Sequence, residues 1–220
     1  MKKYQKIDNV FKFDEKYRKI LGLNEPFDTF KNIQWEGTEK VDGTNIRIHW
    51  NGYEIDFAGR TDKSIIPPHL LEYLIKTFKT KEMEYVFEQM FGEKEVYLFG
   101  EGCGPKIQAD GQKYFNEPTF VLFDVNVDGY DLTRQKVNLI AMQLGLNAVP
   151  VLFHGTLEEA INWVSTPSLS FVGKCEHEIE GLVLVPANDL QLYDKHGKML
   201  KCKLKYEDVK RLKGDNYENN

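Results

Sequence analysis

Alternating apolar and polar positions predict strands early in the chain. Within residues 46–50, apolar residues alternate with the polar Arg47 and His49, which is the pattern of a strand with one buried face. Asn51-Gly52 follows directly and favours a tight hairpin turn, so residues 53–58 are expected to return as an antiparallel strand.

Helical spacing of apolar residues appears later. After two prolines, the apolar positions recur every three or four residues and predict one helix over residues 69–90. Further helices are expected over 132–144, closed by Gly145, and over 157–164. A short helix over 14–21 is expected near the N-terminus.

The remaining apolar runs predict strands over residues 96–100, 119–127, 181–185, 190–193 and 199–204. Helices and strands do not alternate regularly, so the chain is expected to be an α+β protein with mainly antiparallel sheets flanked by helices. No repeat or low-complexity linker divides it, and we expect a single domain over residues 1–220.

Composition narrows the class of protein. The hydrophobic share of 41% is that of a folded globular chain rather than a disordered one. No apolar run approaches the ~18 residues of a membrane span, and no apolar segment follows the basic N-terminus, so neither a membrane nor secretion is expected. Cys103, Cys175 and Cys202 lack metal-site or disulfide spacing, which favours a cytoplasmic protein.

Net charge of −5 argues against a non-specific nucleic-acid binder. A local basic groove would still bind a polynucleotide, because phosphate contacts depend on local positive potential. Composition therefore leaves the partner open.

The segment Glu39–Asn45, with the sequence E-K-V-D-G-T-N, carries the strongest chemical signal. Lys40 can act as a covalent nucleophile where cations, a metal or desolvation disfavour its ammonium form. Gly43 would leave room for a phosphate. Taken alone, this pattern fits a solvated lysine at a strand end at least as well.

Later segments supply groups that would support such a lysine. Lys201 and Lys203 stand at i and i+2 of a predicted strand, so both would face Lys40 or an α-phosphate with positive charge. The same alternation also fits an exposed strand face. Glu180 precedes the apolar run 181–185 and suits a divalent metal, or it is a strand-edge glutamate that stays hydrated.

Three further residues are candidates for nucleotide contacts. Glu101 lies in a glycine-rich segment that allows close backbone approach, and it would bind a ribose hydroxyl unless the segment is only a turn. Phe123 would stack on a purine, or it belongs to the core. Arg60 would pair with a phosphate through its forked donors.

Together these segments resemble the covalent nucleotidyltransferase superfamily of polynucleotide ligases and mRNA capping enzymes. The resemblance is carried by six segments in the superfamily's order: Glu39–Asn45 (motif I), Gly59–Thr61 (motif Ia), Phe99–Glu101 (motif III), Phe120–Val125 (motif IIIa), Glu180–Val183 (motif IV) and Lys201–Lys203 (motif V). Asn45 and the forms of motifs I, III and V are similar to RNA ligases, particularly the RNA ligase 2-like group. Asp42 departs from the histidine frequent in that group.

The resemblance implies an ATP-grasp-like ligase adenylation domain. Lys40 would attack the α-phosphate of ATP and form lysyl-AMP, which is then passed to an RNA 5′-phosphate and displaced by a 3′-hydroxyl. The implied roles of the other residues are an RNA-end or phosphate contact for Arg60, a ribose contact for Glu101, adenine stacking for Phe123, binding of Mg²⁺ or Mn²⁺ for Glu180, α-phosphate contacts for Lys201 and Lys203, and nucleotide contacts for Glu39 and Asn45.

The alternatives are a DNA ligase or a GTP-dependent capping guanylyltransferase, against which Asn45 argues, and a nucleic-acid-binding module without catalysis. Because the candidate catalytic positions are all filled, the last is disfavoured. Only about 15 residues follow Lys205, so no appended C-terminal OB-fold or helical domain is expected. The sequence leaves the natural RNA substrate and the oligomeric state open.

Overall fold

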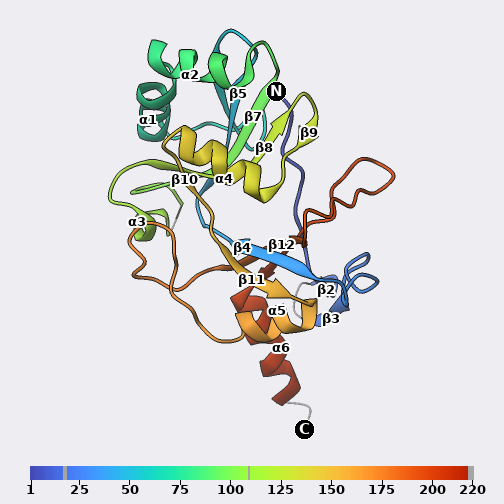
Figure 1. Cartoon of the computed structure of the whole chain (residues 1–220). Helices are drawn as coiled ribbons and strands as arrows, with labels where there is room; N and C mark the ends of the chain where they lie inside the picture. The colour runs from blue at the N-terminus through green and yellow to red at the C-terminus, as the bar shows by residue number, and fades with distance from the viewer. Residues whose placement is uncertain (17–18, 109, 218–220) are drawn as a thin grey trace. The chain divides into compact units, whose positions relative to one another are not determined.

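The computed structural model describes residues 1–16, 19–108 and 110–217, and the chain divides into two compact units (Figure 1). Unit 1 consists of Met1–Tyr4, Asp42–Val149 and Val172–Lys174, and unit 2 consists of Gln5–Val41, Pro150–Phe171 and Cys175–Asn220. The expected α+β class with mainly antiparallel sheets is confirmed. That residues 1–220 act as one adenylation domain stays a prediction.

Unit 1 is built on a six-stranded, mainly antiparallel sheet with the order β10-β8-β7-β5-β6, in which β9 also pairs with β8. Its strands are β5 (Thr44–Trp50), β6 (Ile55–Gly59), β7 (Val96–Cys103), β8 (Thr119–Val127), β9 (Tyr130–Asp131) and β10 (Asn147–Ala148). The predicted hairpin is present, because Ile46 pairs with Gly59 and Trp50 with Ile55.

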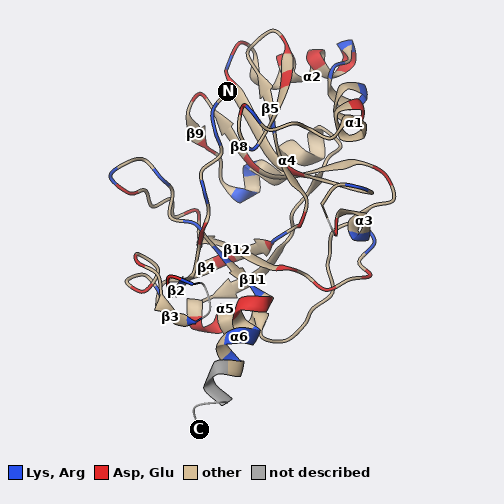
Figure 2. Ribbon diagram, turned by 180° about the vertical axis from the view of Figure 1, so that it is seen from behind, with Lys and Arg blue, Asp and Glu red and all other residues tan. Residues whose placement is uncertain are grey.

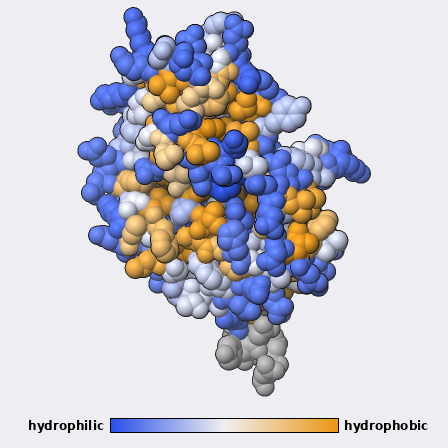
Figure 3. All heavy atoms as spheres, in the orientation of Figure 1, coloured by the Kyte–Doolittle hydropathy of each residue, from blue (hydrophilic) through white to orange (hydrophobic). Residues whose placement is uncertain are grey.

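One face of this sheet packs against helices. They are α1 (Pro68–Phe78), α2 (Lys81–Phe91) and α4 (Arg134–Gln143), and the short α3 (Gly111–Tyr114) lies beside β7. Ile46, Ile48 and Leu98 of the sheet are fully buried with Leu74 and Phe78 of α1, and burial of each such side chain contributes roughly 1.5–3 kcal/mol. Figure 3 shows hydrophobic residues among hydrophilic ones on the side that carries α4.

Because successive strand residues point to opposite sides, the other face of the sheet carries different chemistry. We call it the polar face. Its paired residues are Asn45 with Glu101, Arg47 with Phe99, and His49 with Tyr97. Two of the predicted site residues, Asn45 and Glu101, therefore share a face of the sheet opposite its hydrophobic core.

The single helix predicted over residues 69–90 is wrong, because the chain forms α1 and α2 instead. Thr80 adopts an extended backbone conformation and its hydroxyl accepts a hydrogen bond of 3.1 Å from the Met83 N–H. A threonine in that role satisfies an unpaired donor at a helix start, so it ends one helix and begins the next. The apolar spacing continues across the break and conceals it.

Unit 2 contains a five-stranded sheet with the order β1-β13-β12-β4-β11. Its strands are β1 (Asp8–Asn9), β4 (Trp35–Glu39), β11 (Val151–Gly155), β12 (Gly181–Pro186) and β13 (Cys202–Lys205). Helices α5 (Leu157–Val164) and α6 (Tyr206–Tyr217) cover the face that buries Leu182, Leu184 and Leu204. The predicted helix over 157–164 is confirmed.

Two other expectations in unit 2 are wrong. Residues expected to form a helix over 14–21 instead lead into β3 (Ile20–Leu23), which pairs with β2 (Phe11–Phe13); residues 17 and 18 lie outside the described part of the chain. Asn24 stabilises this hairpin through its side-chain amide, which donates to the Asn9 and Phe11 carbonyls. The strand expected over 190–193 is reduced to one bridge between Tyr193 and Met199.

Charged residues of both signs occur along both units (Figure 2). Among the helices of the described residues, none has the length and apolar character that crossing a membrane requires.

We predict that Thr80→Ala lowers the free energy of unfolding by about 1 kcal/mol, because the Met83 N–H loses its side-chain acceptor. Urea unfolding followed by circular dichroism measures this change. Lys81→Ala, at the neighbouring exposed position, is the control and should change stability by less than about 0.5 kcal/mol. Equal effects of the two substitutions would contradict the capping role.

Candidate active site

Lys40 lies at the end of β4 in unit 2, and its ammonium group forms an ion pair with the Glu180 carboxylate. The other carboxylate oxygen of Glu180 accepts from Lys205 Nζ at 2.5 Å. All three side chains are partly buried, with exposed fractions of 20% for Lys40, 24% for Glu180 and 35% for Lys205. We call these three residues the lysine site.

Strand register explains why residues so distant in sequence meet. The Lys40 N–H donates to the Gly181 carbonyl at 2.9 Å, and Gly181 pairs with Lys205 across β12 and β13. Lys40, Gly181 and Lys205 therefore form one row across three strands. Gly181 has φ +150°, and a Cβ there would lie 2.1 Å from the Leu204 carbonyl oxygen, so only glycine fits beside Glu180.

The electrostatics of Glu180 favour its ionised form. Burial raises the pKa of the Glu180 carboxyl, but the neighbouring Lys40 and Lys205 ammonium groups outweigh burial and hold the pKa below its usual range. Glu180 is therefore a fixed negative charge between two amines at neutral pH.

Glu39 precedes Lys40 but points to the opposite face of β4, and it is 1% exposed. Its carboxylate accepts from the Ser170 hydroxyl at 2.5 Å and from the Phe171 N–H at 2.8 Å. Burial raises the pKa of Glu39, and these two hydrogen bonds oppose that effect. Glu39 thus anchors the segment that leads towards Glu180. Its predicted contact with the nucleotide stays a prediction.

Lys201 and Lys203 were predicted from motif V, and both face the same side of β13 as Lys205, because Cys202 and Leu204 point into the core. Lys201 is only 6% exposed, which differs from the exposed strand face that alternation alone suggests. Because residues are spaced about 3.3 Å apart along a strand, Lys203 lies closer to Lys205 than Lys201 does. Their predicted α-phosphate contacts stay predictions.

Lys205 was not among the residues predicted from the sequence, although its ion pair with Glu180 makes it part of the lysine site. The available signal was the same i, i+2 spacing, which continues from Lys203 to Lys205. Motif V as a three-residue pattern ends at Lys203, two positions before Lys205.

Asn45 and Glu101 lie opposite each other on β5 and β7, on the polar face of unit 1. Asn45 Oδ1 is buried and accepts no hydrogen bond from any residue within the described ranges. An acceptor left in that state is costly, by about 1–3 kcal/mol, so a donor supplied by a ligand would stabilise it.

Phe123 reaches the polar face through a β-bulge. Phe99 pairs with Asp124 and Gly100 pairs with Leu122, so Phe123 is the extra residue on β8. A bulge changes the direction of the side chains around it, and here it allows the consecutive residues Phe123 and Asp124 to leave the core side together. The sequence run of apolar residues predicted the strand but not this irregularity.

Gly43 packs tightly in unit 1. A Cβ at this position would lie 2.4 Å from the Gly102 carbonyl oxygen, so backbone of β7 occupies the space beside it. Close passage against β7 is therefore a structural reason for glycine, in addition to the predicted room for a phosphate. The Asp42 N–H donates to the Tyr114 hydroxyl at 3.1 Å and fixes the adjoining residue.

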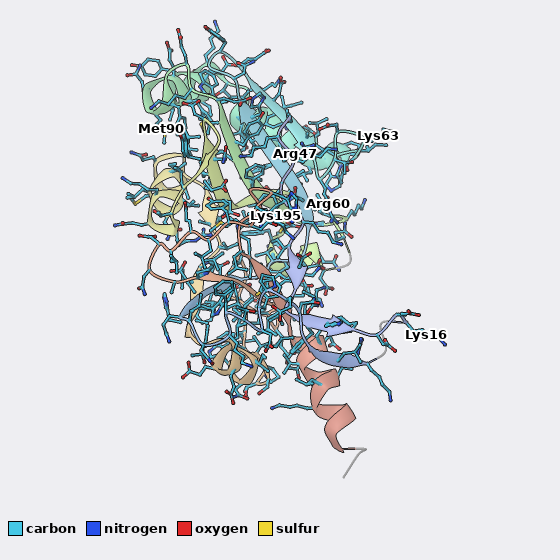
Figure 4. All side chains as sticks on the ribbon, turned by 90° about the vertical axis from the view of Figure 1, so that its right-hand side faces the viewer. Lys16, Arg47, Arg60, Lys63, Met90 and Lys195 are labelled. Carbon is cyan, nitrogen blue, oxygen red and sulfur yellow. The ribbon has the colours of Figure 1, made fainter. Side chains whose placement is uncertain are left out.

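Arg60 is exposed on the loop after β6, and the fully buried Arg47 holds that loop (Figure 4). Arg47 Nε donates to the Gly59 carbonyl at 2.7 Å, and Nη2 pairs with Asp62 at 2.8 Å. Alternation predicted Arg47 only as a polar strand position, and its burial was missed because it depends on the segment that covers it.

A divalent metal has limited protein ligands here. Within residues 1–16, 19–108 and 110–217, no three acidic, histidine or cysteine side chains form a group able to hold an ion. Glu180 alone fits Mg²⁺ or Mn²⁺ bound mainly through nucleotide phosphates, since Mg²⁺ commonly uses one or two carboxylates plus substrate oxygens.

Comparisons with known proteins find a sequence family and solved structures similar to this chain. A family model described as RNA ligase matches residues 33–203. No curated protein sequence matches the chain. A variant of Naegleria gruberi RNA ligase with ATP and Mn superposes with a TM-score of 0.66 at 18% identity, covering 97% of this chain and 58% of that one. The same ligase with PPi gives 0.65 at 17% identity, covering 100% and 59%.

At this identity the structural likeness shows the fold alone. The chain spans less than two thirds of the length of these structural relatives, at 58% for the variant with ATP and Mn.

We predict that Lys205→Met raises the pKa of Glu180, because only Lys40 then offsets the effect of burial. Carbon-13 NMR titration of the Glu180 carboxyl measures the shift. In the unmodified protein the pairing stabilises the fold above the ordinary glutamate pKa of ~4.3 and is lost as pH falls through the lower, folded value. Lys210→Met, at an exposed position on α6, is the charge-matched control and should leave the Glu180 pKa nearly unchanged.

Proposed function

Since the chain belongs to the RNA ligase family, we propose that it is an ATP-dependent RNA ligase that works through a lysyl-AMP intermediate on Lys40. The observation that carries this proposal is the lysine site, in which Lys40, Glu180 and Lys205 meet across three strands. Lys40 and Glu180 come from motifs I and IV, and Lys205 lies two positions after motif V. The RNA ligase 2-like subgroup remains part of the proposal.

In the first step, Lys40 Nζ attacks the α-phosphorus of ATP. A P–N bond forms, the bond from that phosphorus to the bridging oxygen breaks, and pyrophosphate leaves. Because an ammonium group has no free electron pair, Lys40 must leave Glu180 and lose a proton to solvent first. Lys201, Lys203 and Lys205 provide cations on one strand face, which favour the charge that develops on the phosphate.

A divalent cation, held by Glu180 and the nucleotide, would neutralise phosphate charge. Lys205 would hold the Glu180 carboxylate in place both when Lys40 pairs with it and when a cation replaces Lys40. Solved complexes of the Naegleria gruberi ligase with ATP and Mn, and with AMP and Mn, support ATP and a divalent metal as the requirements here.

Glu101, Phe123 and Asn45 of unit 1 are the proposed nucleotide contacts, with Glu101 on the ribose and Phe123 on adenine. The unpaired Asn45 acceptor supports a polar ligand at the polar face. In the later steps an RNA 5′-phosphate oxygen attacks the AMP phosphorus and frees Lys40. The RNA 3′-hydroxyl then attacks the 5′-phosphorus, AMP leaves, and the strand is sealed.

We predict that incubation with ATP and Mg²⁺ adds the mass of one AMP to the protein, and that peptide mapping places it on Lys40. Lys40→Ala should abolish the adduct, because it removes the amine of motif I that would form the bond to AMP. Intact-protein mass spectrometry makes the measurement. An adduct formed from GTP and not from ATP would replace the ligase proposal with a guanylyltransferase, and full labelling of Lys40→Ala would remove Lys40 from the mechanism.

A second prediction concerns sealing. Arg60→Ala should slow joining of a 5′-phosphate to a 3′-hydroxyl in a nicked RNA duplex by about 10- to 100-fold, the effect of losing one charge-assisted hydrogen bond. Labelling by ATP should remain within about twofold. Lys63→Ala, on the same loop, is the matched control (Figure 4). Equal sealing by Arg60→Ala and Lys63→Ala would contradict the assignment of Arg60 to the RNA end.

A further inference from the structure

The first four residues, Met1–Tyr4, belong to unit 1, although the residues after them belong to unit 2. We call this segment the N-terminal strap. It contacts the polar face, which lies opposite the hydrophobic core of the unit. The position of the strap therefore needs an explanation other than burial in that core.

Buried Arg47 anchors the start of the strap. Its Nη1 donates to the Met1 carbonyl at 3.2 Å and to the Lys2 carbonyl at 3.1 Å. The same guanidinium holds the Arg60 loop through Gly59 and Asp62. Burying a guanidinium costs it its hydration, and the two strap carbonyls offset part of that cost, so the strap helps to hold Arg47 in place.

Tyr4 ends the strap between two aromatic side chains of the polar face. Its ring centroid lies 4.9 Å from that of Phe99 and 5.0 Å from that of Phe123, and both contacts are tilted. These separations fall in the range in which aromatic rings attract each other. Phe123 therefore has Tyr4 as a direct neighbour.

The Tyr4 hydroxyl donates to the Asp124 carboxylate. Asp124 lies 3.6 Å from the guanidinium of Arg134, whose Nη2 also donates to the Phe123 carbonyl at 2.6 Å. Burial, followed by the Asp124 charge, raises the pKa of the Tyr4 phenol, which keeps it protonated as the donor. Both the side chain and the backbone around Phe123 are thus tied to Tyr4.

Phe123 needs such support because it is the extra residue of the β8 bulge and has no partner in the pairing of β7 with β8. Strand pairing alone does not fix the direction of a bulged residue. The contacts that Tyr4 and Arg134 make supply that restraint.

We propose that Tyr4 is a positioning residue for the nucleotide, because it holds the Phe123 ring in the orientation in which that ring stacks on adenine. This inference rests on the proposed function and adds to it a role for the N-terminal strap. Tyr4 itself need not touch the reacting atoms.

The test measures the rate of self-adenylylation against ATP concentration in the full-length protein. Tyr4→Ala should raise the KM for ATP at least fivefold while the rate at saturation falls less than twofold. Tyr4→Phe keeps the ring but loses the hydroxyl, so a two- to fivefold rise in KM is expected. Tyr53→Ala, which alters a tyrosine of unit 1 that is 74% exposed, should leave KM unchanged.

A double-mutant cycle separates positioning from a general effect on folding. In a Phe123→Ala background, Tyr4→Ala should have no further effect on KM, since its effect acts through the Phe123 ring. The same factor in both backgrounds would overturn the proposal, and so would an unchanged KM in Tyr4→Ala. Should Tyr4→Ala fail to unfold cooperatively, Tyr4→Phe decides, and a KM equal to that of the unmodified protein rejects the role.

Calorimetric binding of ATP distinguishes failure of this inference from failure of the proposed function. If the unmodified protein binds ATP but forms no adduct, the proposed chemistry fails, and the Tyr4 comparison is decided from the dissociation constants with the same expected factors. If it neither binds ATP nor forms an adduct, both proposals are overturned.

Discussion

The ionised carboxylate of Glu180, placed between two amines, is the interaction on which the lysine site depends. Strand register brings Lys40 and Lys205 together, and the Glu180 carboxylate between them offsets the repulsion between their like charges. The register of the strands puts Lys40, Gly181 and Lys205 in one row beside Glu180, and Gly181 allows the strands to approach there. Under the proposed function, this carboxylate would exchange the Lys40 amine for a divalent metal.

Unit 1 follows a different constraint, which is that a buried polar group needs partners. Arg47 is fully buried and obtains them from the strap and from the loop of Arg60. The bulge at Phe123 creates a similar need, which Tyr4 and Arg134 meet. Polar and aromatic interactions on the polar face therefore fix the segments that carry the proposed nucleotide and RNA contacts. Helices stabilise the sheet from its other face.

Local patterns predicted the elements well where a single interaction decides them. The hairpin at Asn51-Gly52 and the helix over 157–164 follow from turn chemistry and from apolar spacing. The helix over 69–90 was wrong because one threonine hydroxyl at position 80 outweighs continuous spacing. The helix over 14–21 was wrong because β3 pairs with β2, and a pairing between strands is not visible in the periodicity of either.

Residue types in a fixed order were enough to indicate the α+β class, the family, and Lys40 and Glu180 as chemical candidates. The contacts of the folded chain were needed to show that Lys205 completes the lysine site, that Glu39 points away to Ser170, and that Arg47 and Tyr4 lie beside the proposed contacts. Those facts depend on strand register, on a bulge and on which segment covers a sheet face. Such features arise from pairing between distant residues, and no local spacing encodes them.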